Sequence, residues 1–173
     1  MVVQNKHHLH ALGSGETQYP QEYSPDLLEA VSNPAPERDY WVRLNCPEFT
    51  SLCPVTRQPD FARIEIAYIP DQLLVESKSL KLYLFSYRNQ GDFHEACVNQ
   101  IVTDLVKLLA PRYLEAIGYF TPRGGIAIHP YVNCAAEKEN WQQFAKERLQ
   151  KFSLDIRNPV SYTHLRAHET RHD

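Results

Sequence analysis

Long apolar runs are missing from the 173-residue sequence. No segment approaches the roughly 20 apolar residues that a transmembrane helix needs. The N-terminal stretch MVVQNKHHLHALGSGETQYP also lacks the continuous apolar core of a secretion signal. From these absences we expect a cytoplasmic protein with no membrane partner.

An excess of basic charge is missing as well, because 18 Lys and Arg residues stand against 21 Asp and Glu residues and leave a net charge of −3. Surfaces that bind nucleic acid usually carry an excess of positive charge. We therefore expect no direct nucleic-acid partner, and a role in RNA metabolism would run through a small precursor. The length fits a single domain.

No CxxC pair occurs among the cysteines, which are Cys46, Cys53, Cys97 and Cys134. Zinc ribbons and thioredoxin-like motifs need such a pair, so neither is predicted and no metal site is expected. In a reducing cytoplasm each thiol is a small packed side chain or a nucleophile. A dinucleotide-binding glycine turn is missing too, because Gly13 and Gly15 do not follow a strand and no third glycine completes the pattern.

The patterns that are present predict an α+β fold. Alternation predicts two antiparallel hairpins, one from strands over 61–69 and 80–87 and one from strands over 113–120 and 126–132. Apolar spacings of three and four predict helices over 92–109, with Asp92 and Glu95 as a capping box, and over 137–152. A short helix over 25–31 is predicted to begin at the N-cap Ser24. A small antiparallel sheet with helices on one face satisfies this order.

The domain is expected to span residues 1–158, with an N-terminal arm over 1–38. The tail over 159–173, PVSYTHLRAHETRHD, has no apolar periodicity and resembles translated sequencing-library adapter. We interpret it as a non-native, disordered end, the alternative being a genuine polar tail. Its histidines His164, His168 and His172 are not interpreted as metal ligands on their number alone.

Four motifs carry candidate chemistry, and the first is FTSLCPVTRQPDF over 49–61. Cys53 and Asp60 are expected on a loop before the first strand. A cysteine attacks as its thiolate, and a nearby carboxyl group can accept the proton and return it. By itself the pattern is more typical of a packed cysteine and a turn-forming aspartate.

The second motif, VESKSLKLYLF over 75–85, interrupts an apolar run with polar groups. It indicates either a polar turn before an exposed strand face, or a site at which Lys78 and Lys81 meet phosphates and Ser77 donates a hydrogen bond.

The third motif, GDFHE over 91–95, places His94 and Glu95 in a first helical turn. Glu95 either compensates the helix dipole or accepts two parallel N–H bonds from a guanine-type edge. Phe93 packs in the core or supplies a stacking face. In the fourth motif, FTPRGGI over 120–126, Arg123 is a solvent-exposed turn residue or a ligand of a cofactor phosphate.

Taken together, LCPVTRQPDF, ESKSLKLYLFSYRN, GDFHE and FTPRGGI resemble the short, single-module form of the 7-cyano-7-deazaguanine (preQ0) reductase family, in family order. The resemblance runs from about Gly13 to Val132. It implies a tunnelling fold (T-fold), in which antiparallel sheets from several subunits close a barrel and active sites lie between subunits of a homo-oligomer. It also implies NADPH-dependent reduction of the nitrile of preQ0 to 7-aminomethyl-7-deazaguanine (preQ1), in queuosine biosynthesis for tRNA modification.

The resemblance further assigns roles to the motif residues. Cys53 is similar to the family nucleophile that forms a thioimide, and Asp60 to the proton donor, while His94 would assist the second step. Substrate contacts are implied for Val75, Glu76, Ser77, His94 and Glu95, and NADPH contacts for Lys78, Lys81 and Arg123. Arg57 departs from the family pattern, in which a smaller residue is expected after Thr56. The alternatives are a cyclohydrolase-like enzyme, for which the sequence offers no zinc spacing, and a noncatalytic T-fold protein that binds a purine or pterin.

Overall fold

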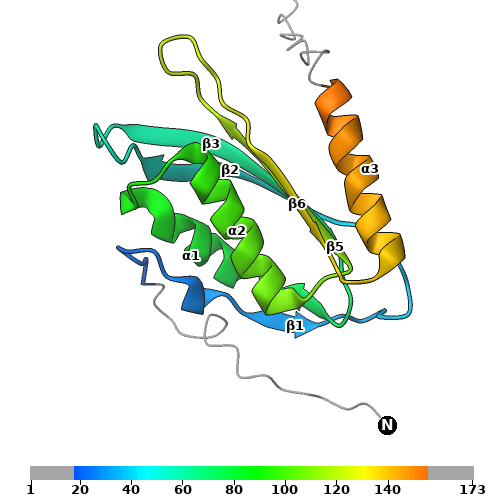
Figure 1. Cartoon of the computed structure of the whole chain (residues 1–173). Helices are drawn as coiled ribbons and strands as arrows, with labels where there is room; N and C mark the ends of the chain where they lie inside the picture. Colours follow the sequence, from blue (N-terminus) through cyan, green and yellow to red (C-terminus); the bar gives the residue numbers. More distant parts are fainter. Residues whose placement is uncertain (1–17, 156–173) are drawn as a thin grey trace, which may run out of the picture.

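The computed structural model describes residues 18–155, which form an α+β domain (Figure 1). Its elements in chain order are η1 (Pro25–Leu27), β1 (Ala30–Ser32), β2 (Val42–Leu52), β3 (Pro59–Ile69), β4 (Leu73–Val75), α1 (Ser77–Phe85), η2 (Ser86–Asn89), α2 (His94–Leu109), β5 (Tyr113–Phe120), β6 (Tyr131–Ala135) and α3 (Glu139–Asp155). Four antiparallel strands form a sheet in the order β2-β3-β5-β6, and β1 pairs with β4 in a second, two-stranded sheet. The predicted tail lies outside the described residues, as does the first part of the predicted arm.

The strand β3 runs through the sheet and shows why the alternating pattern folds as it does. Ile64, Ile66 and Tyr68 are buried on one face, whereas Arg63 and Glu65 are only half-buried on the other. Successive side chains of a strand point to opposite faces of the sheet. A period of two therefore buries one row of apolar side chains and keeps the polar row near solvent. The predicted strand over 61–69 is confirmed.

The register of the sheet determines which chain segments meet at the end that carries the site. Ser51 near the end of β2 pairs with Asp60 at the start of β3, and Ala62 of β3 pairs with Phe120 at the end of β5. These two pairings bring the segment after β2 and the segment after β5 to the same end of the sheet, beside the beginning of β3.

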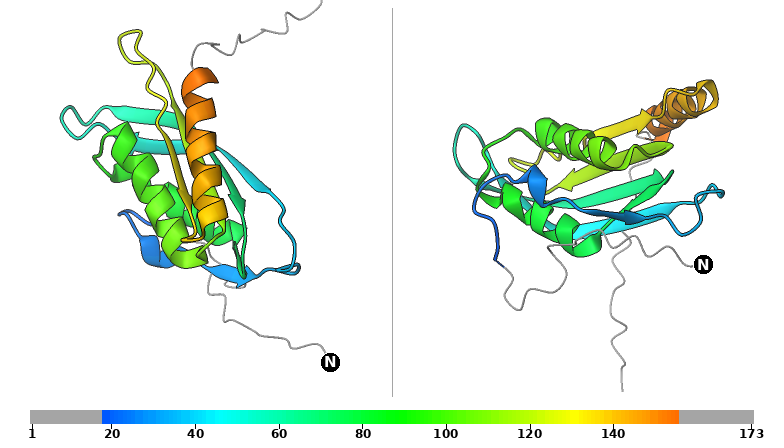
Figure 2. Two further views of the ribbon diagram at one scale, coloured as in Figure 1. Left: turned by 45° about the vertical axis from the view of Figure 1, so that its right-hand side comes forward. Right: turned by 90° about the horizontal axis from the view of Figure 1, so that it is seen from below.

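The core lies between the sheet and the helices α1 and α2 (Figures 1 and 2). Val98, Ile101 and Leu105 of α2 are buried at spacings of three and four, as predicted for an amphipathic helix. Gly118 of β5 permits the close approach of α2, because a Cβ atom there would lie 2.8 Å from Cγ2 of Val98. Packing of this kind places the start of α2 against the end of β5.

The helix α3 packs on the opposite face of the sheet, and the expectation of helices on one face only is therefore wrong. Phe144 contacts Tyr113 with ring centroids 4.9 Å apart, and Arg148 Nη2 lies 2.5 Å from Glu115 Oε1. Tyr113 and Glu115 alternate along β5 with residues that face α2, so their side chains point to the other face. The predicted helix over 137–152 is itself confirmed.

The segment predicted as a strand over 80–87 is helical instead, in α1 and η2. Both carboxylate oxygens of Glu76 accept N-terminal amides of α1, from Lys78 N at 2.9 Å and from Ser79 N at 2.7 Å. Leu80, Tyr83 and Leu84, at helical spacings, are buried in the core. The short apolar run fits both the two-residue period of a strand and the 3.6-residue period of a helix. The N-cap and the packing against the sheet stabilise the helix.

One longer strand was missed, and one predicted strand begins later than expected. The strand β2 was not predicted, because its polar residues and the irregularity between Cys46 and Phe49 hide the alternation. The strand predicted over 126–132 begins only at Tyr131, in β6, whereas the strand predicted over 113–120 is confirmed as β5.

The two predicted helix caps also differ. Only a 3-10 turn, η1, forms within the helix predicted over 25–31, followed by β1, and the Ser24 side chain makes no capping hydrogen bond. The helix α2 begins at His94 with Phe93 as its N-cap, and no side chain caps it. Asp92 instead accepts a hydrogen bond from Phe93 N at 2.9 Å, so the capping box with Glu95 does not form.

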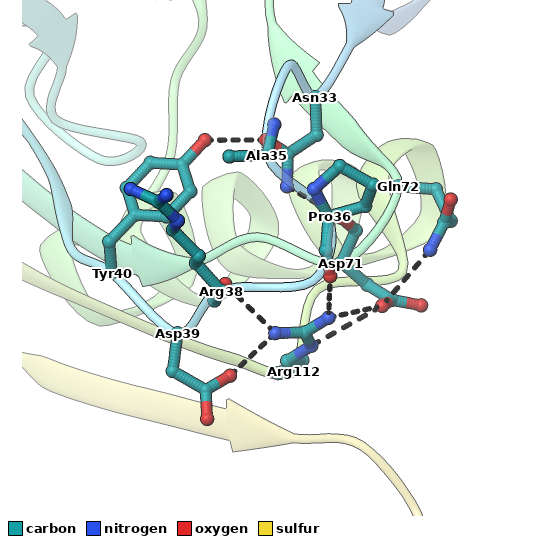
Figure 3. Close-up of polar contacts among 9 residues, drawn as sticks. All are labelled: Asn33, Ala35, Pro36, Arg38, Asp39, Tyr40, Asp71, Gln72 and Arg112. Carbon is teal, nitrogen blue, oxygen red and sulfur yellow. Dashed lines mark hydrogen bonds and ion pairs between the residues drawn. The ribbon is translucent and has the colours of Figure 1, made fainter.

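A cluster around Arg112 fixes the loop between β1 and β2 (Figure 3). Its guanidinium lies 2.5 Å from Asp39 Oδ1 and 3.1 Å from Asp71 Oδ1, and it donates to the backbone oxygens of Pro36 and Arg38. These charge-assisted hydrogen bonds join the loop to the turn between β3 and β4. The turn leads into Val75 and the beginning of α1.

Candidate active site

Cys53 begins a short turn that connects β2 to β3. Its backbone N donates to Gln58 O at 2.9 Å, and its backbone O accepts from Arg57 N at 3.0 Å. The sulfur lies 3.5 Å from Thr56 N, and the side chain is partly exposed. A thiol in this position is held by a closed turn and remains accessible to a reactant.

Hydrogen bonds favour the ionised form of this thiol. The Thr56 hydroxyl, the Arg123 guanidinium and backbone amides of the turn lower the pKa of Cys53 from 9.0 to about 6. Donors that stabilise a thiolate make a cysteine a better nucleophile near neutral pH. The opposite case is Cys97, which is fully buried and whose pKa burial raises to about 12. Of these two thiols, only Cys53 has the environment of a nucleophile.

Asp60 is the second residue of β3. The expectation that it lies on a loop is therefore wrong. Its side chain is 3% exposed, and its Oδ1 atom is the acceptor for two partners. Arg123 Nε donates to Oδ1 at 2.6 Å, and His94 Nε2 lies 3.2 Å from the same atom. Within residues 18–155, Oδ2 of Asp60 is buried and has no hydrogen-bond partner. A buried carboxyl group with one satisfied and one unsatisfied oxygen is suited to exchanging a proton.

His94 is held from a second direction by the end of β5. Its ring stacks on Phe120 with centroids 3.9 Å apart and an interplanar angle of 9°. The start of α2 is tied to the cysteine turn through Leu52, which receives a hydrogen bond at its O from Asp92 N at 3.0 Å and donates one from its N to Gln90 O at 2.9 Å. Cys53, Asp60, His94 and Arg123 therefore form one cluster, which we call the cysteine cluster.

The other predicted substrate residues lie elsewhere in the fold. Val75 ends β4, and its N donates to the Tyr68 hydroxyl at 3.2 Å. Glu76 caps α1, and Ser77 Oγ lies 3.4 Å from Glu76 Oε1. In the described part of the chain, no hydrogen bond or ion pair joins these residues to the cysteine cluster. Of the predicted substrate residues, His94 belongs to the cysteine cluster, and Glu95 follows it in the sequence with an exposed side chain.

Residues suited to cofactor phosphates are found on α1. Lys78 is half-buried in its first turn, and Lys81 is exposed with Nζ 5.5 Å from the centre of the Tyr19 ring. Within residues 18–155, neither lysine takes part in an ion pair, so both ammonium groups fit a phosphate ligand. Arg123, predicted with them, contacts Asp60.

Two features of the site were not found from the sequence. The Thr56 hydroxyl acts on Cys53 from three residues away, which is a common arrangement in a turn and was a usable signal. Phe120 was predicted only as the end of a strand, and its stacking with His94 depends on how α2 packs against β5.

Two broader properties concern the described residues. No helix within 18–155 has the length and apolar character needed to cross a membrane. Across the same range, no group of three or more His, Cys, Asp or Glu side chains has the arrangement of a metal site.

Comparison with known proteins adds to this geometry. A family model described as QueF-like protein matches residues 59–139. A relative from Bacteroides thetaiotaomicron, named NADPH-dependent 7-cyano-7-deazaguanine reductase, is 60% identical over 148 residues, which cover 86% of this chain and 97% of the relative. A relative of the same name from Streptococcus thermophilus is 63% identical over 145 residues, covering 84% of this chain and 88% of that one.

The fold is similar to that of a solved protein as well. The crystal structure of the archaeosine synthase QueF-Like in the apo form superposes with a TM-score of 0.52 at 19% identity, over 57% of this chain and 96% of that one. At this identity the likeness concerns the fold. The identities near 60% over most of the chain are decisive for the family, and the chain belongs to the NADPH-dependent 7-cyano-7-deazaguanine reductases.

Proposed function

We propose that this protein reduces the nitrile of 7-cyano-7-deazaguanine to the aminomethyl group of 7-aminomethyl-7-deazaguanine with NADPH, as a step of queuosine biosynthesis. Family membership supports the reaction. The observation that carries the proposal is the environment of Cys53, a partly exposed thiol whose pKa is lowered to about 6. Arg123, one of the groups that lower it, also binds the buried carboxyl group of Asp60. That pairing matches the needs of covalent catalysis on a nitrile.

In the proposed first step, the thiolate of Cys53 adds to the nitrile carbon and a new C–S bond forms. One electron pair of the C≡N bond moves to nitrogen. The nitrogen takes a proton from Asp60, which has accepted it from the Cys53 thiol as the thiolate formed. The product is a thioimide, a better hydride acceptor than the nitrile. The cofactor supplies hydride, and four electrons in total require two NADPH per nitrile.

After hydride reaches the carbon, the C–S bond breaks, Cys53 leaves as thiolate, and an imine remains. A second hydride addition and protonation of nitrogen give the amine. His94 is suited to deliver this proton, since Nε2 lies 3.2 Å from Asp60 Oδ1, and within residues 18–155 its Nδ1 is buried without a hydrogen-bond partner.

Recognition of the deazaguanine is proposed for two groups of residues. Glu95, exposed beside His94, would accept paired N–H bonds from the guanine-type edge, and Phe93, 61% exposed, offers a stacking face. Val75, Glu76 and Ser77 form the second group, which makes no hydrogen bond to the cysteine cluster in the described part of the chain. A site completed between two subunits would bring the groups together.

That arrangement fits the proposed T-fold, in which sheets of several subunits close a barrel. Within residues 18–155, β2 lies at one edge of the four-stranded sheet and β6 at the other, and an edge strand can pair with a neighbouring sheet. We propose a cytoplasmic homo-oligomer without a nucleic-acid partner. Lys78 and Lys81 are the residues proposed to hold the NADPH phosphates.

The test is oxidation of NADPH by the purified protein with 7-cyano-7-deazaguanine, followed by absorbance. The expected result is two NADPH oxidised per nitrile and no oxidation when the nitrile is omitted. If 7-cyano-7-deazaguanine binds and NADPH is not oxidised, the protein is a noncatalytic member of the fold. If GTP is hydrolysed instead, the cyclohydrolase alternative is correct.

A further inference from the structure

Arg123 is aimed at the cysteine cluster by a two-residue turn. Its backbone N donates to Ile126 O at 3.0 Å, and Ile126 N donates to Arg123 O at 3.0 Å. Between them, Gly124 and Gly125 have φ values of 56° and 82°. Two successive positive φ angles are the signature of a type I′ turn, which glycine adopts without strain. The glycines of this motif therefore serve the turn that presents Arg123.

The Arg123 side chain ends between two proposed catalytic groups. Its Nε atom donates to Asp60 Oδ1 at 2.6 Å, and Nη2 also lies within ion-pair distance of Oδ1. The same guanidinium also lowers the pKa of the Cys53 thiol. One cation thus links two residues that the proposed reaction uses together.

The contact also distinguishes the two oxygens of Asp60. Arg123 and His94 both occupy Oδ1, whereas Oδ2 has no partner within residues 18–155. A proton shared with a substrate nitrogen needs an oxygen that is not engaged by a cation. Oδ2 is therefore the atom left for proton transfer.

Resting on the proposed function, we propose that Arg123 is a positioning residue, which holds Cys53 as a thiolate and turns Oδ2 of Asp60 toward the reacting nitrogen. This role differs from the predicted one, contact with an NADPH phosphate. A guanidinium that already binds a buried carboxylate has fewer donors left for a phosphate.

Alkylation of Cys53 with iodoacetamide, measured against pH without NADPH or nitrile, tests the proposal. Peptide mass spectrometry separates Cys53 from the partly exposed Cys46 and Cys134. In the native chain the rate should rise with a midpoint near 6, the pKa that the hydrogen bonds impose. In Arg123→Gln the midpoint should move up by about one unit or more, because a neighbouring cation is lost. Arg123→Lys should give an intermediate midpoint.

Arg57→Gln is the matched control, since Arg57 is a cation of the same turn that is absent from the groups acting on the sulfur. It should leave the midpoint within about 0.3 unit of the native one, as screening weakens exposed charges. Circular dichroism checks that each variant is folded.

An unchanged midpoint in folded Arg123→Gln would overturn the proposal. So would an unchanged midpoint combined with a raised KM for NADPH, which is the pattern of a phosphate ligand. Failure of the proposed function looks different, because alkylation needs neither substrate. If the midpoint depends on Arg123 and the protein does not oxidise NADPH, the effect of Arg123 on Cys53 is supported and the proposed reaction is refuted.

Discussion

The imidazole of His94 lies flat on the ring of Phe120, with centroids 3.9 Å apart and an angle of 9° between the planes. Stacking fixes the plane of the imidazole, and the 3.2 Å contact from Nε2 to Asp60 Oδ1 fixes its direction within that plane. A residue that moves a proton is efficient only while its geometry is held. Phe120 is thus expected to support the reaction although it touches no reactant.

Phe120→Leu should therefore lower kcat by about tenfold, a fraction of the ~100- to 10,000-fold that general acid–base catalysis contributes. Leucine keeps the site apolar and removes the flat surface beneath His94. The matched control is Phe49→Leu, which alters a buried ring that packs edge-on against Phe120. Steady-state kinetics should show the loss of kcat in the first variant only. Equal kcat values in the two variants, at similar stability, would contradict this role.

Glu76→Gln should lower the free energy of unfolding by about 1 kcal/mol, the usual effect of weakening an N-cap. Its two carboxylate oxygens accept Lys78 N at 2.9 Å and Ser79 N at 2.7 Å, and an amide retains only one acceptor and no charge. Urea denaturation followed by circular dichroism measures the change. An unaltered unfolding curve would show that the cap contributes nothing.

Glu95→Gln should affect use of the nitrile and leave stability nearly unchanged. Glu95 is exposed in the first turn of α2, and no carboxylate capping bond forms there, so stability should change by less than about 1 kcal/mol. If its carboxylate accepts two N–H bonds of the deazaguanine, kcat/KM for the nitrile should fall at least about 100-fold. Unchanged kcat/KM would remove Glu95 from the proposed substrate site.

The sequence indicated the fold class because its strongest patterns survive in the structure. The alternation over 61–69, the strand over 113–120 and the periodic helix that ends at Leu109 are all present. The strand predicted over 80–87 failed because eight residues fit both periods, and a cap from Glu76 together with burial on the sheet selects the helix. The strand β2 was missed because an irregularity between Cys46 and Phe49 interrupts its alternation of apolar and polar residues.

Cys53, Asp60 and His94 were selected from the sequence by the resemblance, and the register of the sheet brings them to one cluster. The contact of Arg123 with Asp60 could not be predicted, because it joins residues 63 positions apart through a turn after β5. Such a contact depends on strand register and turn geometry together, and neither is readable from one motif.

Arg57→Gly should raise the free energy of unfolding by about 0.5–1 kcal/mol. Arg57 has φ = 61° in the cysteine turn, a left-handed conformation that costs a side-chain-bearing residue about 1 kcal/mol. Arg57→Ala is the control, since it removes the guanidinium and keeps the Cβ atom that causes the strain. Chemical denaturation should rank the glycine variant above both others. A glycine variant no more stable than the alanine variant would show that the turn holds no such strain.

The central claim is that the sulfur of Cys53 bonds covalently to the nitrile carbon. Intact-protein mass spectrometry after mixing the protein with 7-cyano-7-deazaguanine, without NADPH, tests it most directly. We predict an increase equal to the mass of the nitrile, located on the peptide containing Cys53, absent from Cys53→Ala and lost when NADPH is added. An unmodified protein that nevertheless oxidises NADPH with the nitrile, or full activity of Cys53→Ala, would contradict the account.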